Sequence, residues 1–391
     1  MVAPLFTPLL APLALIFACT ANSGPAGCPA EPARLSARAA AGAKATDDRG
    51  LIEIEIEIER RVAVMGTTLE IVLLAGERMS GLRASEAALR AIEAAERRLS
   101  TWTADSELAR LNAAAPGLVH ELTPALAADL AGALHWWRAT DGAFDPGVGS
   151  LVEAWDLRGA GRAPSPAALR DALAVAGLTG LQLEGRRATI LRAGLRIEEG
   201  AFGKGVGLDA ALATLEGCDV RDVLLDLGGQ IALHGWSEPV PLAVADPRDR
   251  DRPAFELLLS SGSVATSANS ERGLRVDGEP VGHLLDPRTG RPAPDFGSLT
   301  VIATDATAAD CLSTGLFVLG PEAALAFALA HDGVDVLVLE PTPHGLRARA
   351  SAGLDGRLRP LIDTVTLEIV TTTPSRSPRT PQPQPNSPRQ R

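Results

Sequence analysis

The sequence predicts an α+β fold, with a single large domain of mixed or antiparallel sheets and packed helices, on three observations. Segment 52–59 (IEIEIEIE) alternates with a period of two, as in a strand with one buried face. Residues 80–99 repeat apolar side chains at spacings of three and four, as in an amphipathic helix. The rest shows no regular βαβ rhythm and no strand followed by GxGxxG. We therefore do not expect a Rossmann fold.

Further elements follow from local patterns in chain order. A second strand is predicted over 68–74 and an Ala-rich helix over 123–139. Later strands are predicted at 222–226, 241–245, 299–303 and 334–339, with helices near 205–216 and 306–330. These elements place the domain at 51–370. The Ala/Pro/Gly-rich segment 22–50 is predicted to be a flexible linker, and 371–391, which has no acidic residue and no core former, a disordered tail.

Composition limits the function classes. The 391-residue chain has a net charge of -11, so it lacks the basic footprint of a nucleic-acid-binding protein. An acidic protein that binds an anionic nucleotide needs a local cation, either a metal ion or placed basic side chains. Only Lys44 and Lys204 are lysines among 37 basic residues, which draws attention to Lys204 in the predicted domain. The cysteines show no zinc spacing, and Cys311 in an apolar run is predicted to be a core residue.

The N-terminus predicts export. Residues 2–18 are uncharged and mostly apolar, and three prolines argue against a membrane-spanning helix, so we interpret 1–21 as a leader. Segment 16–19 (IFAC) resembles a bacterial lipobox, in which Cys19 would carry a lipid and anchor the protein to a membrane surface. We expect a periplasmic protein, with a plain secretory signal or a misassigned start codon as the alternatives.

Two segments carry side chains suited to catalysis and metal binding. Segment 283–290 (HLLDPRTG) places a histidine three residues before an Asp-Pro turn and a Thr-Gly pair, so it brings an imidazole, a carboxylate and a hydroxyl together. Asp310 and Thr314 are four residues apart, so on a helix their oxygens point the same way. Such a pair is half of a hard-cation site. Taken alone, Asp310 would be interpreted as a helix cap or a solvated residue.

Three further segments suit ligand binding. Segment 198–205 (EEGAFGKG) is a glycine-rich turn leading into a helix, whose free N–H groups favour phosphate, although it is not a Walker A motif. In 141–146 (DGAFDP), small residues beside Asp145 allow a ligand to approach the backbone. In 99–112, residues 100–107 read alone as a turn and a helix cap. Trp102 offers a flat face for a flavin or adenine ring, or else is buried as core.

These segments occur in the same order as in the FAD:protein FMN transferases, the ApbE family once labelled thiamine-biosynthesis lipoproteins. The resemblance covers roughly residues 62–340 and also includes MGTT at 65–68 and SVATSA at 263–268. The chain departs from the family pattern with Glu198 for Asp and Ala268 for Gly, and with Ser270 where Tyr is frequent. If that glycine has a positive φ, Ala268 would cost about 1 kcal/mol.

The resemblance implies an ApbE-like fold and a role for each matching residue. His283 would be catalytic, either as a general base or by orienting the acceptor loop. A Mg²⁺ ion, with Mn²⁺ as an alternative, would be bound by the Ala201 carbonyl, Asp310 and Thr314. The implied FAD contacts are Met65, Trp102, Ala143, Phe144, Asp145, Glu198, Lys204 and Leu284.

The implied reaction is Mg²⁺-dependent transfer of FMN from FAD to a Ser or Thr hydroxyl of a flavoprotein that carries a Ser/Thr-Gly-Ala-Thr-type motif, with release of AMP. Three alternatives remain open. The same residues would serve an FAD pyrophosphatase that gives FMN and AMP. The protein could instead be an exported FAD-binding lipoprotein without transfer, or an inert scaffold, against which the retention of Lys204 argues.

Overall fold

The computed structural model describes residues 45–46, 52–53, 55–269, 275–276 and 279–372. The predicted leader, almost all of the linker and all but two residues of the predicted tail lie outside this part of the chain. The linker prediction needs one correction, because β1 (Ala45–Thr46) lies within it and pairs antiparallel with β2 (Ile52–Glu53). In the described residues, no helix has the length and apolar character needed to cross a membrane.

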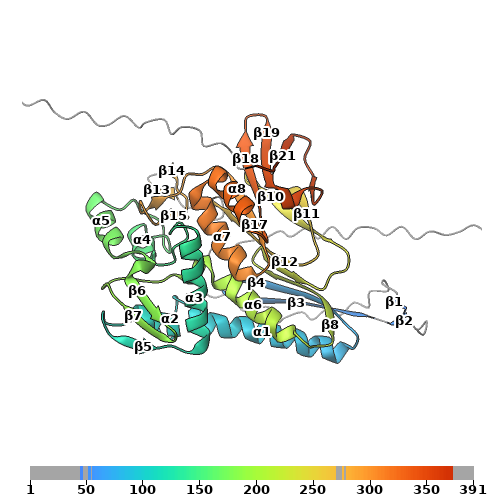
Figure 1. Ribbon diagram of the computed structural model, residues 1–391, viewed down its shortest axis with the longest axis horizontal. Helices are drawn as coiled ribbons and strands as arrows, with labels where there is room; N and C mark the ends of the chain where they lie inside the picture. The colour runs from blue at the N-terminus through green and yellow to red at the C-terminus, as the bar shows by residue number, and fades with distance from the viewer. Residues whose placement is uncertain (1–44, 47–51, 54, 270–274, 277–278, 373–391) are drawn as a thin grey trace, which may run out of the picture.

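A nine-stranded sheet forms the centre of the molecule (Figure 1). Its neighbouring strands pair antiparallel, except for the two at one edge, residues 345–351 and 365–370, which pair parallel. In spatial order the strands are β21 (Val365–Val370), β19 (Gly345–Ser351), β18 (Val334–Thr342), β17 (Ser298–Ala303), β12 (Gly262–Ala268), β9 (Gln230–His234), β8 (Val220–Leu227), β4 (Thr67–Ala75) and β3 (Ile56–Val64). The predicted mixed, mostly antiparallel α+β architecture is therefore confirmed.

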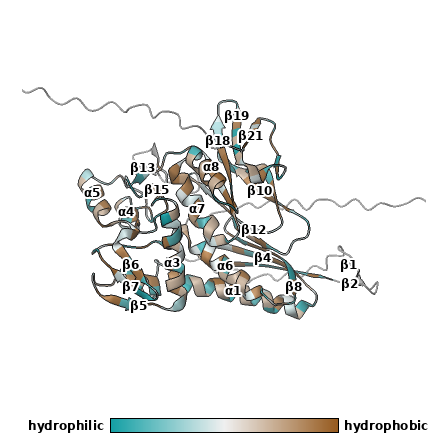
Figure 2. Ribbon diagram, viewed as in Figure 1, coloured by the Kyte–Doolittle hydropathy of each residue, from teal (hydrophilic) through white to brown (hydrophobic). Residues whose placement is uncertain are grey.

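The sequence of β18 shows why its strand is buried on both faces. Val336 and Val338 belong to the apolar cluster beneath the helices, whereas Leu337 and Leu339 belong to the cluster on the opposite face. Side chains alternate across a strand, so a continuous apolar run supplies both layers. Hydrophobic residues also predominate along β4 (Figure 2).

Helices cover one face of the sheet. They are α1 (Arg78–Leu99), α6 (Gly203–Leu215), α7 (Ala306–Leu319) and α8 (Pro321–Ala330). α6 packs between α1 and α7 (Figure 1). The prediction of one helix over 306–330 was wrong, because Gly320 has φ +87° and Pro321 follows it. A left-handed glycine followed by proline ends one helix and starts the next.

The other face of the sheet is partly covered by a three-stranded sheet. Its strands are β10 (Val240–Asp246), β11 (Asp249–Leu259) and β20 (Leu358–Pro360). The short helix η4 (Ala352–Leu354) precedes β20 along the chain. Phe255 and Leu257 of β11 are buried in the cluster shared by the two sheets. The two sheets therefore share one apolar core.

A smaller lobe is inserted between α1 and α6. It contains α2 (Glu107–Asn112), β5 (Val119–Glu121), α3 (Pro124–Ala139), α4 (Gly149–Ala154), α5 (Pro166–Val175), η1 (Leu178–Gly180), β6 (Leu181–Glu184) and β7 (Arg187–Ile190). Its apolar cluster includes Phe202 and Cys311 from the main body, which confirms Cys311 as a core residue. Short elements η2 (Glu199–Ala201), β13 (Arg275–Val276), β14 (Glu279–Pro280), β15 (Leu285–Asp286) and β16 (Arg291–Pro292) complete the fold.

Candidate active site

Met65 occupies a strained turn between β3 and β4. Val64 pairs with Thr67, so the turn has two residues, and both have positive φ (Met65 +51°, Gly66 +70°). Such hairpin turns favour Asn-Gly, and a residue with a long side chain in this region costs about 1 kcal/mol. The Met65 side chain packs at the start of α6, with Sδ 3.3 Å from the position of a Cβ built on Gly207. Strain at one residue is a signature of a functional position.

Asp310 meets the first turn of α6. Its carboxylate accepts a hydrogen bond from the Gly205 amide at 3.0 Å, and the residue is 4% exposed. A Cβ on Gly205 would meet the Ala306 carbonyl oxygen and would lie 2.6 Å from Thr307 Cα. Only glycine therefore lets the N-terminal turns of α6 and α7 approach this closely.

Lys204 is the cation of this group. Burial raises the pKa of the Asp310 carboxyl, and the positive charge of Lys204 opposes that rise. Burial also raises the pKa of Asp226, to about 6, and Lys204 again lowers it. Asp226, at the end of β8, accepts a hydrogen bond from the Gly229 amide at 2.7 Å. The lysine singled out by composition thus acts on two buried carboxyls.

The residues predicted to bind a metal lie near one another. Asp310 and Thr314 are one turn apart on α7, and η2, which ends at Ala201, packs against α7. One carboxylate and one hydroxyl suit Mg²⁺, which keeps several waters and takes phosphate oxygens as ligands. Among the described residues, no three His, Cys, Asp or Glu side chains converge on a point as in an all-protein metal cage. The donor set therefore fits an open, hard-cation site.

Trp102 and Glu198 are brought together by a third residue, Arg158. The Arg158 guanidinium lies 4.5 Å above the Trp102 ring and forms an ion pair with Glu198. Trp102 is 67% exposed, so the alternative of a buried core tryptophan is wrong. Burial raises the pKa of Glu198, and Arg158 opposes the shift. The carboxamide of Asn112 fixes the preceding residue, Ile197, with hydrogen bonds of 2.9 and 2.8 Å.

His283 lies in the loop before β15. Asn269, which directly follows β12, contacts the residues on either side of His283. A Cβ on Gly282 would lie 2.6 Å from Asn269 Nδ2, and the Leu284 amide donates to Asn269 Oδ1 at 3.4 Å. Leu284 packs against an apolar cluster that includes Ala308, Ala309 and Leu312 of α7. The loop of His283 therefore lies against the helix that carries Asp310.

The second half of the same motif is structural. Asp286 accepts two hydrogen bonds from the Arg288 guanidinium, at 2.8 and 3.0 Å, so its carboxylate is engaged within the turn. Gly290 has φ +67° and lies against three leucines of α4 and α5, and its carbonyl accepts from Trp155 Nε1 at 2.7 Å. Of the three predicted groups, the Asp286 carboxylate thus shapes the turn of this loop.

Segment 143–145 is buried. Phe144 is fully buried, and its backbone lies so close to Gly315 of α7 that a Cβ there would be 2.7 Å from Phe144 Cβ. Asp145 accepts hydrogen bonds from the amides of Gly147 and Leu178, at 2.8 and 3.0 Å, and burial raises its pKa to about 6. Ala143 shares the apolar cluster on which Leu284 packs. Through Phe144 and Ala143 this segment supports the α7 side of the site, while the Asp145 side chain is engaged by backbone.

The expected strain at Ala268 does not occur. Ala268 is the last residue of β12, pairs with Ser298 and is not among the residues with positive φ. The predicted cost of about 1 kcal/mol is therefore wrong for this chain.

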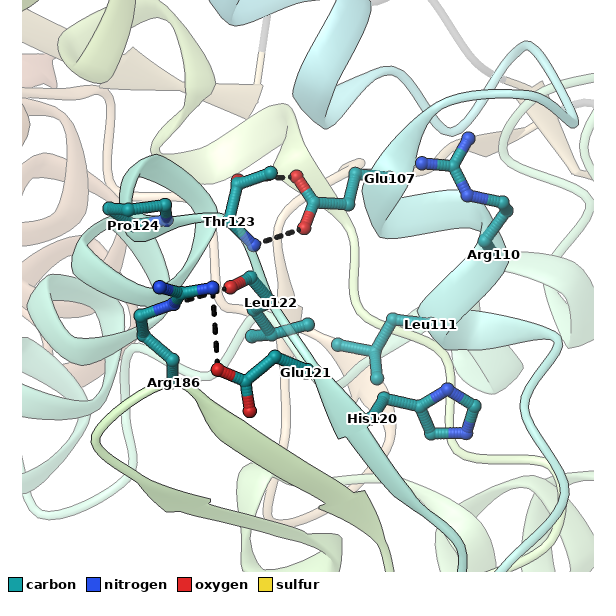
Figure 3. Close-up of a pocket in the computed structure, with 9 residues that line it drawn as sticks. All are labelled: Glu107, Arg110, Leu111, His120, Glu121, Leu122, Thr123, Pro124 and Arg186. Carbon is teal, nitrogen blue, oxygen red and sulfur yellow. Dashed lines mark hydrogen bonds and ion pairs between the residues drawn. The ribbon is translucent and has the colours of Figure 1, made fainter.

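A hollow of about 360 Å³ lies between α2 and β5 (Figure 3). Among its polar groups, Glu107 accepts from the amide and hydroxyl of Thr123 and Arg186 pairs with Glu121, while Nε2 of His120 is buried without a hydrogen-bond partner. None of its lining residues is a predicted site residue. We assign the site to the α6–α7 junction, where buried charges converge, rather than to this hollow.

Sequence patterns missed Arg158, Asn269 and Asp226. Asp226 precedes two glycines of positive φ, Gly228 and Gly229, a local signal that could have marked it. Asn269 directly follows the 263–268 motif but carries no signal of its own. Arg158 is one of many arginines, and only the folded chain places it on Trp102.

Fold and site together define an α+β protein with an acid, a hydroxyl and a lysine at the start of a glycine-rich helix. Residues 65–338 match the ApbE family. The FAD:protein FMN transferase of Treponema pallidum is 31% identical over 332 residues, which span 78% of this chain and 90% of that relative. The chain belongs to the ApbE family.

Solved structures agree with this assignment. The ApbE protein of Thermotoga maritima is 30% identical, with a TM-score of 0.66, and the match covers 73% of this chain and 94% of that one. The flavinyl transferase ApbE of Pseudomonas stutzeri, in its apo form, has a TM-score of 0.69 over 78% of this chain and 97% of its own. At 24% identity the second likeness shows the fold alone.

Proposed function

We propose that this chain is an FAD:protein FMN transferase that moves FMN from FAD to a Ser or Thr hydroxyl of an acceptor flavoprotein and releases AMP. The transferase class follows from the family and from the names of its relatives. The observation that carries the finer proposal is the buried Asp310 carboxylate at the N-terminus of α6, beside Lys204 and one turn from Thr314.

The substrate is an anion, and this chain is acidic overall. The start of α6 supplies backbone N–H groups and the positive end of a helix dipole, and Lys204 adds a point charge. Asp310, Thr314 and the Ala201 carbonyl would hold Mg²⁺, or Mn²⁺ in its place. The bound ion would neutralise charge on the diphosphate and on the departing AMP.

The flavin end has its own contacts. Trp102 offers an exposed ring for stacking, and Met65 lies against the start of α6, where the strained turn holds it. Glu198, on the loop before η2, would make a polar contact to the flavin, with Leu284 packing against it. Ala143, Phe144 and Asp145 would contribute backbone groups, since the last two side chains are engaged in the fold.

His283 would accept the proton of the acceptor hydroxyl. The oxygen then bonds to the phosphorus of the FMN moiety, the bond from that phosphorus to the bridging oxygen breaks, and AMP leaves with that oxygen. A neutral imidazole near pH 7 suits this role. His283 could instead orient the acceptor loop, the second role considered for it. In that case replacing His283 should change the pH dependence of the transfer rate less than if it is the general base.

The proposed acceptor is a flavoprotein with a Ser/Thr-Gly-Ala-Thr-type motif, and the proposed location is the periplasm. An exported chain with a lipid on Cys19 would sit on a membrane surface and meet its acceptors there. Cys19→Ala should then shift the protein from the membrane fraction to the soluble one. An unchanged distribution would leave a plain secretory signal.

The test combines the purified protein with FAD, Mg²⁺ and such an acceptor, and reads the intact mass of the acceptor. We expect a gain equal to one FMN phosphoester, abolished by EDTA, by Asp310→Ala and by His283→Ala. Metal-dependent release of FMN and AMP without a mass gain would indicate the pyrophosphatase. Bound but unprocessed FAD would indicate a binding protein.

A further inference from the structure

Arg158 is held in place by three other residues of the site. Its guanidinium covers one face of Trp102 at 4.5 Å, forms an ion pair with Glu198, and donates to the Thr101 carbonyl at 3.0 Å as well as to the Thr101 hydroxyl. The residue lies in the turn after α4, remote in sequence from all three. Arg158 thus connects the aromatic face and the acidic contact of the proposed flavin site.

The same contacts leave much of this group open to solvent. Trp102 is 67% exposed, an unusual state for so large an apolar side chain, and the Arg158 side chain is 31% exposed. An exposed ring offers a flat face on which an aromatic ligand can stack. The guanidinium lies on the surface that an incoming aromatic ligand would approach.

The phosphate-binding end of the site is near. Glu198 begins the segment that runs through η2 into α6. Arg158 is therefore paired with a residue that lies five positions before the start of α6 and six before Lys204. Glu199 links the two ends: its carboxylate accepts from the Thr101 hydroxyl, and its Cβ and Cγ lie 3.4 Å from a Cβ built on Gly203. Arg158 therefore lies beside the segment that leads into α6.

We propose that Arg158 is a further FAD-binding residue, which exchanges Glu198 for the diphosphate when FAD binds. The diphosphate of FAD carries two negative charges. Its oxygens match the paired N–H donors of the planar guanidinium better than one carboxylate does. The exchange also frees Glu198 for the flavin and uncovers the Trp102 face. This inference rests on the proposed function, because it assigns one more contact to the same substrate.

The test measures the affinities of the full-length purified protein for FAD, FMN and riboflavin by flavin fluorescence, at low and at high salt. We compare wild type with Arg158→Ala, Arg158→Lys and, as a matched control, Arg162→Ala. Arg162 lies four residues after Arg158, just beyond the same turn, and donates to the Ala154 carbonyl at 3.4 Å, so its loss removes the same charge from a neighbouring position.

We expect Arg158→Ala to weaken FAD about tenfold and riboflavin less than about twofold, since only FAD carries the diphosphate. Arg158→Lys should recover part of the loss, the loss should shrink at high salt, and Arg162→Ala should bind like wild type. Equal losses for FAD and riboflavin would show that Arg158 only braces Trp102, and unchanged FAD affinity in both Arg158 variants would also overturn the inference. If wild type binds no FAD, the proposed function itself fails, an outcome that the wild-type titration separates from the other two.

Discussion

The Gly205 amide donates a hydrogen bond of 3.0 Å to the carboxylate of Asp310, a residue 105 positions further along the chain. This contact joins the first turn of α6 to α7, and η2 packs against both helices. The charge of Lys204 acts on the same carboxylate. It fixes a carboxylate against a helix N-terminus before any ligand arrives. Preorganised charge of this kind is the main contribution that a protein scaffold makes to phosphoryl transfer.

Gly205→Ala should disrupt this junction. The new Cβ would lie 2.6 Å from Thr307 Cα, a backbone atom that cannot move without shifting α7. We expect a loss of about 2–4 kcal/mol in the free energy of unfolding, measured by urea denaturation. Gly200→Ala is the matched control, because nothing lies within 4 Å of its Cβ and its φ is not positive. Equal stability of the two variants would contradict the close approach of the helices.

Asp209 should matter more than an ordinary helix cap. Its carboxylate accepts from the amides of Ala306 and Thr307, at 2.7 and 2.8 Å, and so ties α6 to the start of α7. We expect Asp209→Ala to lower the free energy of unfolding by about 2–3 kcal/mol, since two amides at the start of α7 lose their acceptor. Transfer activity should also fall, because the helix that carries Asp310 is no longer tied to α6 by this side chain.

Asp305→Ala provides the comparison for Asp209→Ala. Asp305 caps α7 by accepting from the Ala308 amide at 2.7 Å but makes no hydrogen bond to α6. Its removal should cost about 1 kcal/mol, with activity retained at temperatures where the variant is folded. Activity lost to the same degree in both variants would show that α7 capping alone, rather than the link to α6, supports the site.

Asn269→Ala should reduce turnover rather than FAD affinity. The Asn269 carboxamide contacts Gly282 and Leu284 on either side of His283 and donates to the Ala293 carbonyl at 3.2 Å. Loss of these contacts should let the His283 loop shift, lowering kcat about tenfold with little change in KM for FAD. Ser263→Ala, which removes a 2.7 Å hydrogen bond from β12 to the Ile231 carbonyl of the neighbouring β9, should keep the wild-type kcat. A rise in KM with kcat unchanged would refute this role.

Asp226 should make stability depend on pH. Burial raises its pKa to about 6 from the ordinary 3.8 of an aspartate, so the folded state holds the proton more tightly than the unfolded state does. The free energy of unfolding should therefore fall as pH rises from about 4 to 6, by on the order of 3 kcal/mol from this group, and change no further above pH 7.

Asp226→Asn removes that ionisation and keeps the acceptor for the Gly229 amide at 2.7 Å. The stability of the variant relative to wild type should thus increase between pH 4 and 6 and then level off. The measurement is urea denaturation in EDTA at a series of pH values. A relative stability that decreases over this range would reverse the sign and exclude a raised pKa.

The sequence by itself determined the elements whose patterns are local. The helical spacing of 80–99 and the apolar strands at 299–303 and 334–339 appear in the fold, because period two and period 3.6 arise from backbone geometry alone. The alternating segment 52–59 is strand only in part, since β2 covers 52–53, β3 begins at Ile56 and Glu55 lies outside both. Motif order was enough to predict the family. The end of α7 at Gly320 also has a local signal, a glycine followed by a proline, but the prediction of one helix over 306–330 did not use it.

Only the tertiary structure decided which polar groups serve the site. The carboxylates of Asp286 and Asp145 lie in motifs as clear as that of Asp310, yet a neighbouring arginine engages the first and backbone amides the second. Asp310 instead faces Gly205 and Lys204, and Arg158 covers Trp102. These partners lie from about 50 to about 100 residues apart in sequence. Because such contacts depend on how helices and loops pack, no local pattern encodes them.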